Sequence, residues 1–306
     1  TYKQLLSQDR EETKKTSLHL EAFPENLGVY EELCGLLRRR STVIPFIGAG
    51  FSVAAGCPSW STYIAEQAKK AGMDEAAVLA RIQRGEQEQL MNEVIQAQTL
   101  PLFSRDFQRA FEGQRISPAL SPSANLVGLF DGCMITTNFD RVLEDCLESV
   151  EYPFKEKPVG REDSGRFVRA IYSGSNYLLK LHGSIDEARN RVLTLEEYNA
   201  AYGTGGNDYA LPIPKVLRKV FESFSVIFMG CSLISDRYLS VLKTVYETHQ
   251  EYMPRHFAIL SSPGNEFNRR ARDIFLAGHG ISPIWFPEGD WDSPSRILDL
   301  LRFEAA

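Results

Sequence analysis

The stretch VIPFIGAGFS, residues 43–52, is the most informative part of the chain. An apolar run that ends in Gly48-Ala49-Gly50 predicts a buried strand, a tight turn and the start of a helix. Glycine has no Cβ, so the backbone of such a turn can approach a pyrophosphate, and the amides of a helix N-terminus point at it. The full dinucleotide-binding fingerprint needs a third glycine, but position 53 is Val53. The stretch therefore predicts either a phosphate-binding turn or an ordinary strand–turn–helix connection.

Three later segments also place polar or small residues directly after short apolar runs. They are ITTNFD (135–140), LKLHGSID (179–186) and SVIFMG (225–230), the last followed by Cys231 and Ser232. In an open parallel sheet, ligands bind at the carboxyl ends of the strands. The four segments are therefore predicted to converge on one crevice.

The alternation of strand-like and helical patterns predicts a doubly wound parallel, Rossmann-like α/β fold. Residues 1–40 are interpreted as an N-terminal helical arm, polar enough over 1–24 to lie outside the core, and 41–306 as the Rossmann-like domain. Helical periodicity without a convincing strand predicts a helical insertion over about 60–126. The expected strands are 43–47, 132–136, 177–181, 225–229, 256–260 and 281–286.

The composition indicates a globular protein with a substantial core. The 306 residues are 43% hydrophobic and 24% charged, and the net charge of -6 argues against a dedicated nucleic-acid surface. No run approaches the roughly 20 apolar residues of a membrane span. Five scattered cysteines without a CxxC pair predict a reducing, cytoplasmic setting and no all-cysteine zinc site.

Over about residues 40–290 the chain resembles the sirtuin family. GAGFS (48–52) is similar to the family's glycine-rich loop, TTNFD (136–140) to its Asn-x-Asp motif, and LHG (181–183) to its catalytic His-Gly. Ser232 resembles the family's ribose-contacting serine. The zinc cysteine pairs and the Pro-Asp-Phe-Arg stretch of the deacylases are absent. In these departures the chain looks like the bacterial sirtuin-like branch that hydrolyses NAD in anti-phage defence.

The resemblance implies an NAD+ glycohydrolase that yields ADP-ribose and nicotinamide and acts by NAD+ depletion, as in abortive infection. It implies NAD+ as substrate, no zinc, a homo-oligomer, and an ATPase, helicase or Argonaute-like partner, with no membrane. Two alternatives are an NAD-dependent protein deacylase and a non-catalytic module that senses NAD or another nucleotide. A nuclease is a weaker alternative, because no clustered carboxylates suggest a two-metal site.

Asn138 and His182 are the predicted catalytic residues. The amide of Asn138 both donates and accepts, so it can hold ribose hydroxyls or the attacking water; the alternative is a helix N-cap. His182 is the predicted general base, because the ordinary pKa of histidine lies near neutrality; the alternative is a structural histidine. Asp140 either orients the nicotinamide carboxamide or is a favourable carboxylate in the first turn of a helix.

The remaining candidates are predicted to bind the cofactor. Ser52 either donates to a phosphate or caps the following helix. Phe51 and Trp60 either wall the nicotinamide pocket or belong to the core. The other predicted cofactor-binding residues are Gly48, Ala49, Gly50, Thr137, Gly183, Gly230, Ser232 and Asp236.

Overall fold

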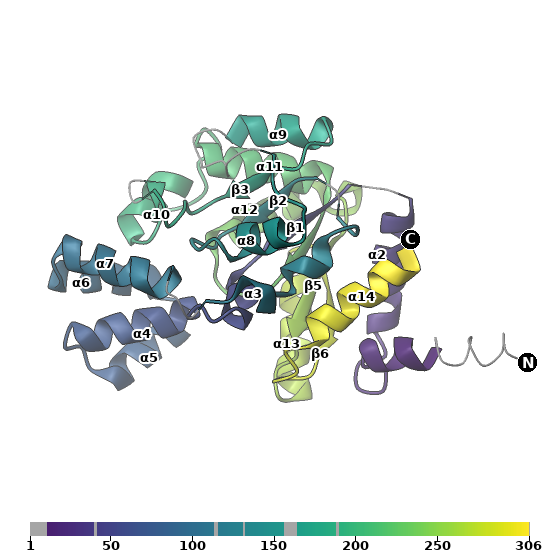
Figure 1. Cartoon of the computed structure of the whole chain (residues 1–306), viewed down its shortest axis with the longest axis horizontal. Helices are drawn as coiled ribbons and strands as arrows, with labels where there is room; N and C mark the ends of the chain where they lie inside the picture. The colour runs from purple at the N-terminus through teal and green to yellow at the C-terminus, as the bar shows by residue number, and fades with distance from the viewer. Residues whose placement is uncertain are drawn as a thin grey trace, which may run out of the picture.

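The protein is built on one parallel sheet with six strands in the order β3-β2-β1-β4-β5-β6 (Figure 1). The computed structural model describes residues 11–39, 42–112, 116–130, 132–155, 164–187 and 190–305. The strands are β1 (Val43–Ile47), β2 (Met134–Thr136), β3 (Leu178–Lys180), β4 (Ser225–Met229), β5 (His256–Ser261) and β6 (Ile281–Phe286). The predicted doubly wound parallel fold is therefore confirmed.

The chain changes direction across the sheet at β1. From there β2 and β3 extend one way, and β4, β5 and β6 extend the other, all in parallel. Phe46 pairs with both Ile135 of β2 and Phe228 of β4, so the carboxyl ends of these three strands lie together. This reversal is the topological switch point at which open α/β sheets bind ligands.

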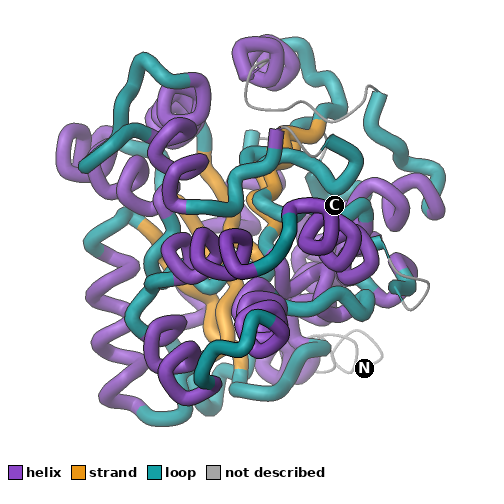
Figure 2. Tube along the Cα trace, turned by 90° about the vertical axis from the view of Figure 1, so that its left-hand side faces the viewer, coloured by secondary structure: helices purple, strands orange, loops and turns teal. Residues whose placement is uncertain are grey.

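Helices cover both faces of the sheet (Figure 2). Alternate strand residues point to opposite faces: Phe46 belongs to one core, which includes residues of α9, α11 and α12, and Ile47 belongs to the other, which includes residues of α2, α8 and α14. These helices are α2 (Asn26–Arg38), α8 (Val142–Ser149), α9 (Ser164–Tyr172), α11 (Pro212–Ser223), α12 (Arg237–His249) and α14 (Ser293–Ala305). The other helices in the described residues after β2 are α10 (Leu195–Tyr202), the short η5 (Gln250–Tyr252) and α13 (Glu266–Ala277).

Between β1 and β2 the described chain contains only helices. They are α3 (Ala49–Ala54), α4 (Trp60–Lys70), α5 (Glu75–Gln83), α6 (Gln87–Ala97), α7 (Leu100–Phe111), η1 (Pro118–Leu120) and η2 (Pro122–Leu126). Helices α4–α7 form the group at the left of Figure 1 and have their own apolar core, in which the Tyr63 ring packs on Phe107 and Phe111. We call α4–α7 the helical insertion.

Part of the N-terminal segment packs against the core, which corrects the expectation that residues 1–24 lie outside it. Leu18 is fully buried and Phe23 is buried. The Asn26 side chain donates to the Leu18 and Trp285 carbonyls and accepts from the Trp285 amide, which ties this segment to β6. Residues 1–10 of the predicted arm lie outside the described residues.

Two helices lie where the sequence predicts loops or mixed structure. Residues 151–176 read as loop-rich, but α9 lies within them and buries Phe167 and Ala170 on the sheet. Residues 187–212 read as mixed, but a capping box at Thr194 and Glu197 starts α10 there. Among the described residues, no helix combines the length and apolar character needed to cross a membrane.

Candidate functional site

The turn after β1 lies directly against the end of β4. A Cβ on Gly48 would lie 2.5 Å from the Gly230 carbonyl oxygen, and one on Gly50 would lie 2.8 Å from the Gly230 Cα. Gly230 itself has φ +67, a conformation that favours glycine. The three glycines are therefore needed for two backbone segments to touch.

In this contact, two of the main-chain amides that were expected to face a phosphate donate hydrogen bonds to β4 and the residue after it. Gly48 N–H donates to the Met229 carbonyl and Gly50 N–H to the Gly230 carbonyl, both at 2.8 Å. The glycines thus join the turn after β1 to the end of β4. The Ala49 amide has no partner within the described chain, and phosphate binding at this turn stays a prediction.

The segments after β2 and β3 run side by side at the same edge of the sheet. Leu181 N–H donates to the Thr136 carbonyl at 2.9 Å, and Ile185 N–H donates to the Phe139 carbonyl at 2.7 Å. The Thr136 hydroxyl also donates to the carbonyl of Ile47, at the end of β1. The candidate asparagine and histidine therefore lie on neighbouring segments, as the sequence predicts.

Asn138 lies at the centre of a buried hydrogen-bond chain. Its side-chain amino group donates to the Gly48 carbonyl at 3.0 Å and to the Ser52 hydroxyl at 2.9 Å. Ser52 in turn donates to Asp140 Oδ1 at 2.9 Å, and the same oxygen accepts from the amide of Val142. Neither Asn138 nor Ser52 caps a helix, because Arg141 and Gly48 hold the N-cap positions of α8 and α3.

Burial raises the pKa of Asp140, and the positive charge of Lys180 opposes that rise. Lys180 is only 1% exposed and pairs with Glu144 at 2.8 Å. Its ammonium also donates to the main-chain carbonyls of Phe139 and Asp140. Sequence reasoning missed Lys180 and Glu144, although a lysine that ends an apolar run was a signal, since lysine is rarely buried without a partner.

His182 is buried between two tyrosines of α10. Its Nε2 shares a hydrogen bond of 2.9 Å with the Tyr202 hydroxyl, and its Nδ1 lies 3.4 Å from the Tyr198 hydroxyl. Next to it, Gly183 has φ +85, and a Cβ there would lie 2.4 Å from the Asn190 carbonyl oxygen. The tyrosines were missed because they belong to a segment without a clear pattern.

Burial lowers the pKa of His182 to about 3, which differs from the near-neutral value on which its assignment as a base rests. The desolvated site disfavours the charged imidazolium. The imidazole is therefore neutral at physiological pH, which is the form that can accept a proton. Because tyrosine hydroxyls lie at both ring nitrogens, a substrate must displace one of them to reach this base.

The segment after β4 brings a second acid toward the tyrosines. Asp236 Oδ2 is buried without a hydrogen-bond partner, and burial raises the pKa of this carboxyl. By contrast, the Ser232 side chain is exposed, and its main-chain carbonyl, not its hydroxyl, accepts from Arg272. Thr137 is half-buried. Contact of these residues with a ligand stays a prediction.

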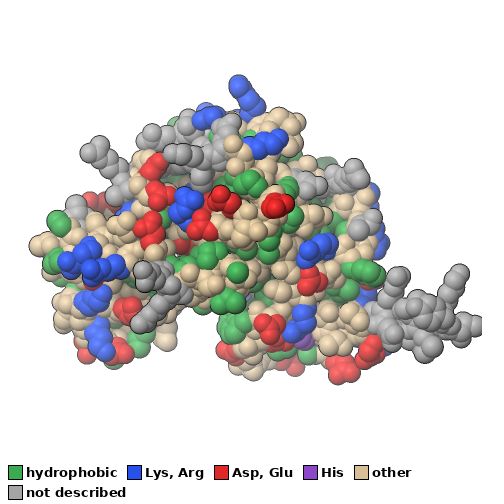
Figure 3. Space-filling view, in the orientation of Figure 1, with side chains coloured by type: hydrophobic (Ala, Val, Ile, Leu, Met, Phe, Trp, Pro, Cys, Tyr) green, Lys and Arg blue, Asp and Glu red, His purple; other side chains and the backbone are tan. Residues whose placement is uncertain are grey.

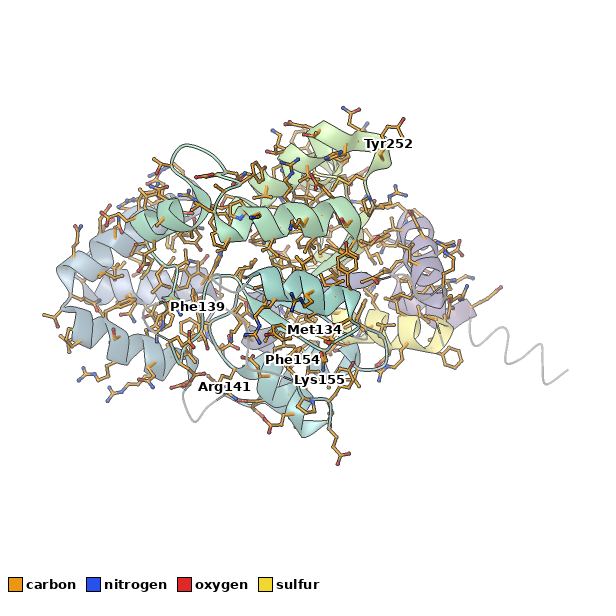
Figure 4. The ribbon with its side chains drawn as sticks, turned by 90° about the horizontal axis from the view of Figure 1, so that it is seen from above. Met134, Phe139, Arg141, Phe154, Lys155 and Tyr252 are labelled. Carbon is orange, nitrogen blue, oxygen red and sulfur yellow. The ribbon has the colours of Figure 1, made fainter. Side chains whose placement is uncertain are left out.

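The aromatic candidates belong to two different cores. Phe51 is buried between the sheet and its covering helices. Trp60 is half-buried and packs 5.8 Å from the Tyr63 ring and 5.7 Å from the Phe139 ring. Figure 4 shows Phe139 on the side of the β2–α8 segment that faces the helical insertion. Trp60 and Phe139 thus join the insertion to the edge that carries the candidate residues.

The outline of the molecule is hollowed near these elements. In the space-filling view, a notch separates the helical insertion from the part that carries α13, and α3 lies above it (Figures 1 and 3). All five cysteines are free and buried, and the described residues contain no group of His, Cys, Asp and Glu that could hold a metal ion.

The strand order and the polar residues at the strand ends define a Rossmann-like α/β protein with its candidate site at the switch point. The family model of the SIR2-like domain matches residues 132–284, which is half of the chain, and the protein belongs to this family. A SIR2-like domain is consistent with NAD-related activity. No curated protein matches the sequence.

Proposed function

We propose that the protein hydrolyses NAD+ to ADP-ribose and nicotinamide. The observation that carries this proposal is the gathering of Gly48, Asn138, His182 and Gly230 at the carboxyl ends of four adjacent strands. Membership of the SIR2-like family supports a nicotinamide dinucleotide as the ligand of this edge.

In the proposed reaction the bond between the nicotinamide nitrogen and C1′ of its ribose breaks first. The bonding electrons leave with nicotinamide, so the ribose becomes an oxocarbenium-like cation that water attacks at C1′. The water proton passes to neutral His182 and then to solvent. Asn138 holds the water or the ribose hydroxyls, and such positioning can supply several kcal/mol of the barrier.

We further propose that this hydrolysis depletes NAD+ in defence against phage, and that the active form is a homo-oligomer or includes an ATPase, helicase or Argonaute-like partner. The resemblance to the defence branch supports this role. The measurement is bacterial survival and NAD+ content after infection, with and without Asn138→Ala. Loss of protection in the variant is expected; equal protection would contradict the proposal.

Product identification separates hydrolysis from the alternative functions. The purified protein is incubated with NAD+, alone and with an acetyl-lysine peptide, and the products are identified by mass spectrometry. ADP-ribose and nicotinamide without the peptide are expected. An acetylated ADP-ribose that forms only with the peptide would instead identify a deacylase, and bound but unconsumed NAD+ would identify a sensor.

A further inference from the structure

We propose that Lys180 is a positioning residue: it holds the Asn138–Asp140 segment so that Asn138 presents its side-chain oxygen, and not its amino group, to the substrate. The proposal rests on the proposed NAD+ hydrolysis for its catalytic meaning. Its geometry depends only on the contacts at the ends of β1, β2 and β3.

The orientation of the Asn138 amide is fixed by a group that can only accept. A main-chain carbonyl has no hydrogen to give, so the atom that faces the Gly48 carbonyl at 3.0 Å must be the amino nitrogen. The second hydrogen of that nitrogen goes to the Ser52 hydroxyl. Both donors are therefore used within the protein.

The same order of donors and acceptors continues to Asp140. Since the Ser52 oxygen accepts from Asn138, its own hydrogen is free to donate to Asp140 Oδ1. A carboxylate accepts and cannot return a hydrogen, so it holds the Ser52 hydroxyl in this direction. Reversal of the Asn138 amide would place two acceptors opposite each other at Gly48.

The free end of the Asn138 side chain is thus its Oδ1. No residue in the described part of the chain donates a hydrogen bond to this oxygen. Oδ1 is also not one of the fully buried side-chain atoms that lack a hydrogen-bond partner. Asn138 as a whole is 8% exposed. Oδ1 is an acceptor, so the ligand group that it recognises is a hydroxyl donor, either the attacking water or a ribose hydroxyl.

Lys180 anchors this arrangement from the neighbouring strand. Its ammonium donates to the carbonyls of Phe139 and Asp140, the two residues that follow Asn138. Its bond to Glu144 at 2.8 Å connects the same ammonium to the first turn of α8. The buried ammonium of Lys180 thus holds the main chain directly after Asn138, at Phe139 and Asp140. Phe139, which Figure 4 labels, shows the place of this segment beside the helical insertion.

The test replaces Lys180 with the uncharged Lys180→Met. The matched double variant Lys180→Met/Glu144→Leu also removes the partner, because a lone buried carboxylate destabilises a fold in its own right. We expect kcat to fall by about 10- to 100-fold in the double variant, as a displacement of about 1 Å can cause, while the Kd for NAD+ changes little. The conservative variant Glu144→Asp, which keeps a carboxylate for the buried Lys180 ammonium, is expected to retain most of the activity.

Hydrogen–deuterium exchange supplies a readout that does not depend on activity. We expect faster exchange in the double variant over residues 137–142, with unchanged exchange in β5 and β6. Wild-type kcat and wild-type exchange over 137–142 would overturn the proposal. A uniform rise in exchange across all strands would also overturn it, since that result indicates a purely structural role. If the wild-type protein does not consume NAD+, the proposed function fails, and the exchange data still decide whether Lys180 holds the segment.

Discussion

Individual glycines determine how closely the strand ends approach one another. Gly230 takes φ +67 and lies between the Phe51 amide and the Gly48 carbonyl, where an added Cβ would meet them at 2.9 and 3.0 Å. Both the backbone conformation and the available space therefore require glycine at this position. The contact also sets the path of the turn between β1 and α3.

We predict that Gly230→Ala lowers the free energy of unfolding by about 1–3 kcal/mol. We also predict that it lowers NAD+ turnover more than a control glycine variant does, because the β1–α3 turn must move. The matched control is Gly205→Ala, which has φ +74 but nothing within 4 Å of the added Cβ. The control carries only the conformational strain, about 1–2 kcal/mol, without the collision. Urea unfolding and nicotinamide release are measured for both. Equal turnover in the two variants would contradict the role of the Gly230 contact.

The helical insertion is attached to the sheet domain through identifiable contacts between elements. Arg237 at the start of α12 makes a two-pronged ion pair with Glu88 of α6, at 3.0 and 2.6 Å. The same guanidinium lies 5.6 Å from the centre of the Tyr198 ring, beside the candidate base. The position of the insertion is therefore coupled to the α10 tyrosines.

We predict that Glu88→Gln loosens the insertion and costs about 1 kcal/mol of stability, since it removes a partly buried charged hydrogen-bond pair. The control is Glu247→Gln on α12, the helix of Arg237; it breaks the exposed 3.8 Å pair with Lys243 and is expected to change stability by less than about 0.5 kcal/mol. Limited proteolysis within α4–α7 and urea unfolding provide the readouts. Indistinguishable cleavage rates in the two variants would show that the pair does not hold the insertion.

The sequence allowed most of the elements to be predicted but few of their mutual contacts. Short apolar runs bounded by turn residues identified the strands on both sides of the switch point. Helix α10 was missed, since its fold depends on a capping box and on tyrosines that pack around His182. The Lys180–Glu144 pair joins two segments 36 residues apart, so no local pattern reveals it.

Gly48 and Gly50 also make contacts that the sequence around them does not reveal. Their spacing indicated a tight turn, and the turn is present. Their close approach is to the end of β4, however, which depends on a strand that lies far along the sequence. A single sequence predicts that a backbone must come close to something, but the neighbour emerges only from the fold.

The molecule as a whole buries two histidines in the neutral form. Burial lowers the pKa of both His182 and His256 to about 3. Because these values lie below that of an exposed histidine, the unfolded chain binds more protons between about pH 3 and 6.5. Their contribution to stability is therefore present above about pH 6.5 and is lost as the pH falls.

We predict that His256→Asn reduces the loss of unfolding free energy as the pH falls below about 6.5. The asparagine oxygen can replace His256 Nδ1 as the acceptor of the Val226 amide, so the hydrogen bond is kept and the titration is removed. From pH 6.5 to 5, each buried histidine is expected to account for about 2 kcal/mol of lost stability. Urea unfolding at several pH values measures the slope. Parallel curves for the variant and the wild type would contradict this account.

The most direct test of the central claim is the rate of nicotinamide release from NAD+ by the purified protein, compared with Asn138→Ala and His182→Ala. The matched control is His249→Ala, which removes a surface histidine paired with Glu222. The account predicts release by the wild type and the control, and loss of at least about 100-fold in both site variants. Unchanged release in Asn138→Ala or His182→Ala would contradict the assignment of the site to the ends of β2 and β3.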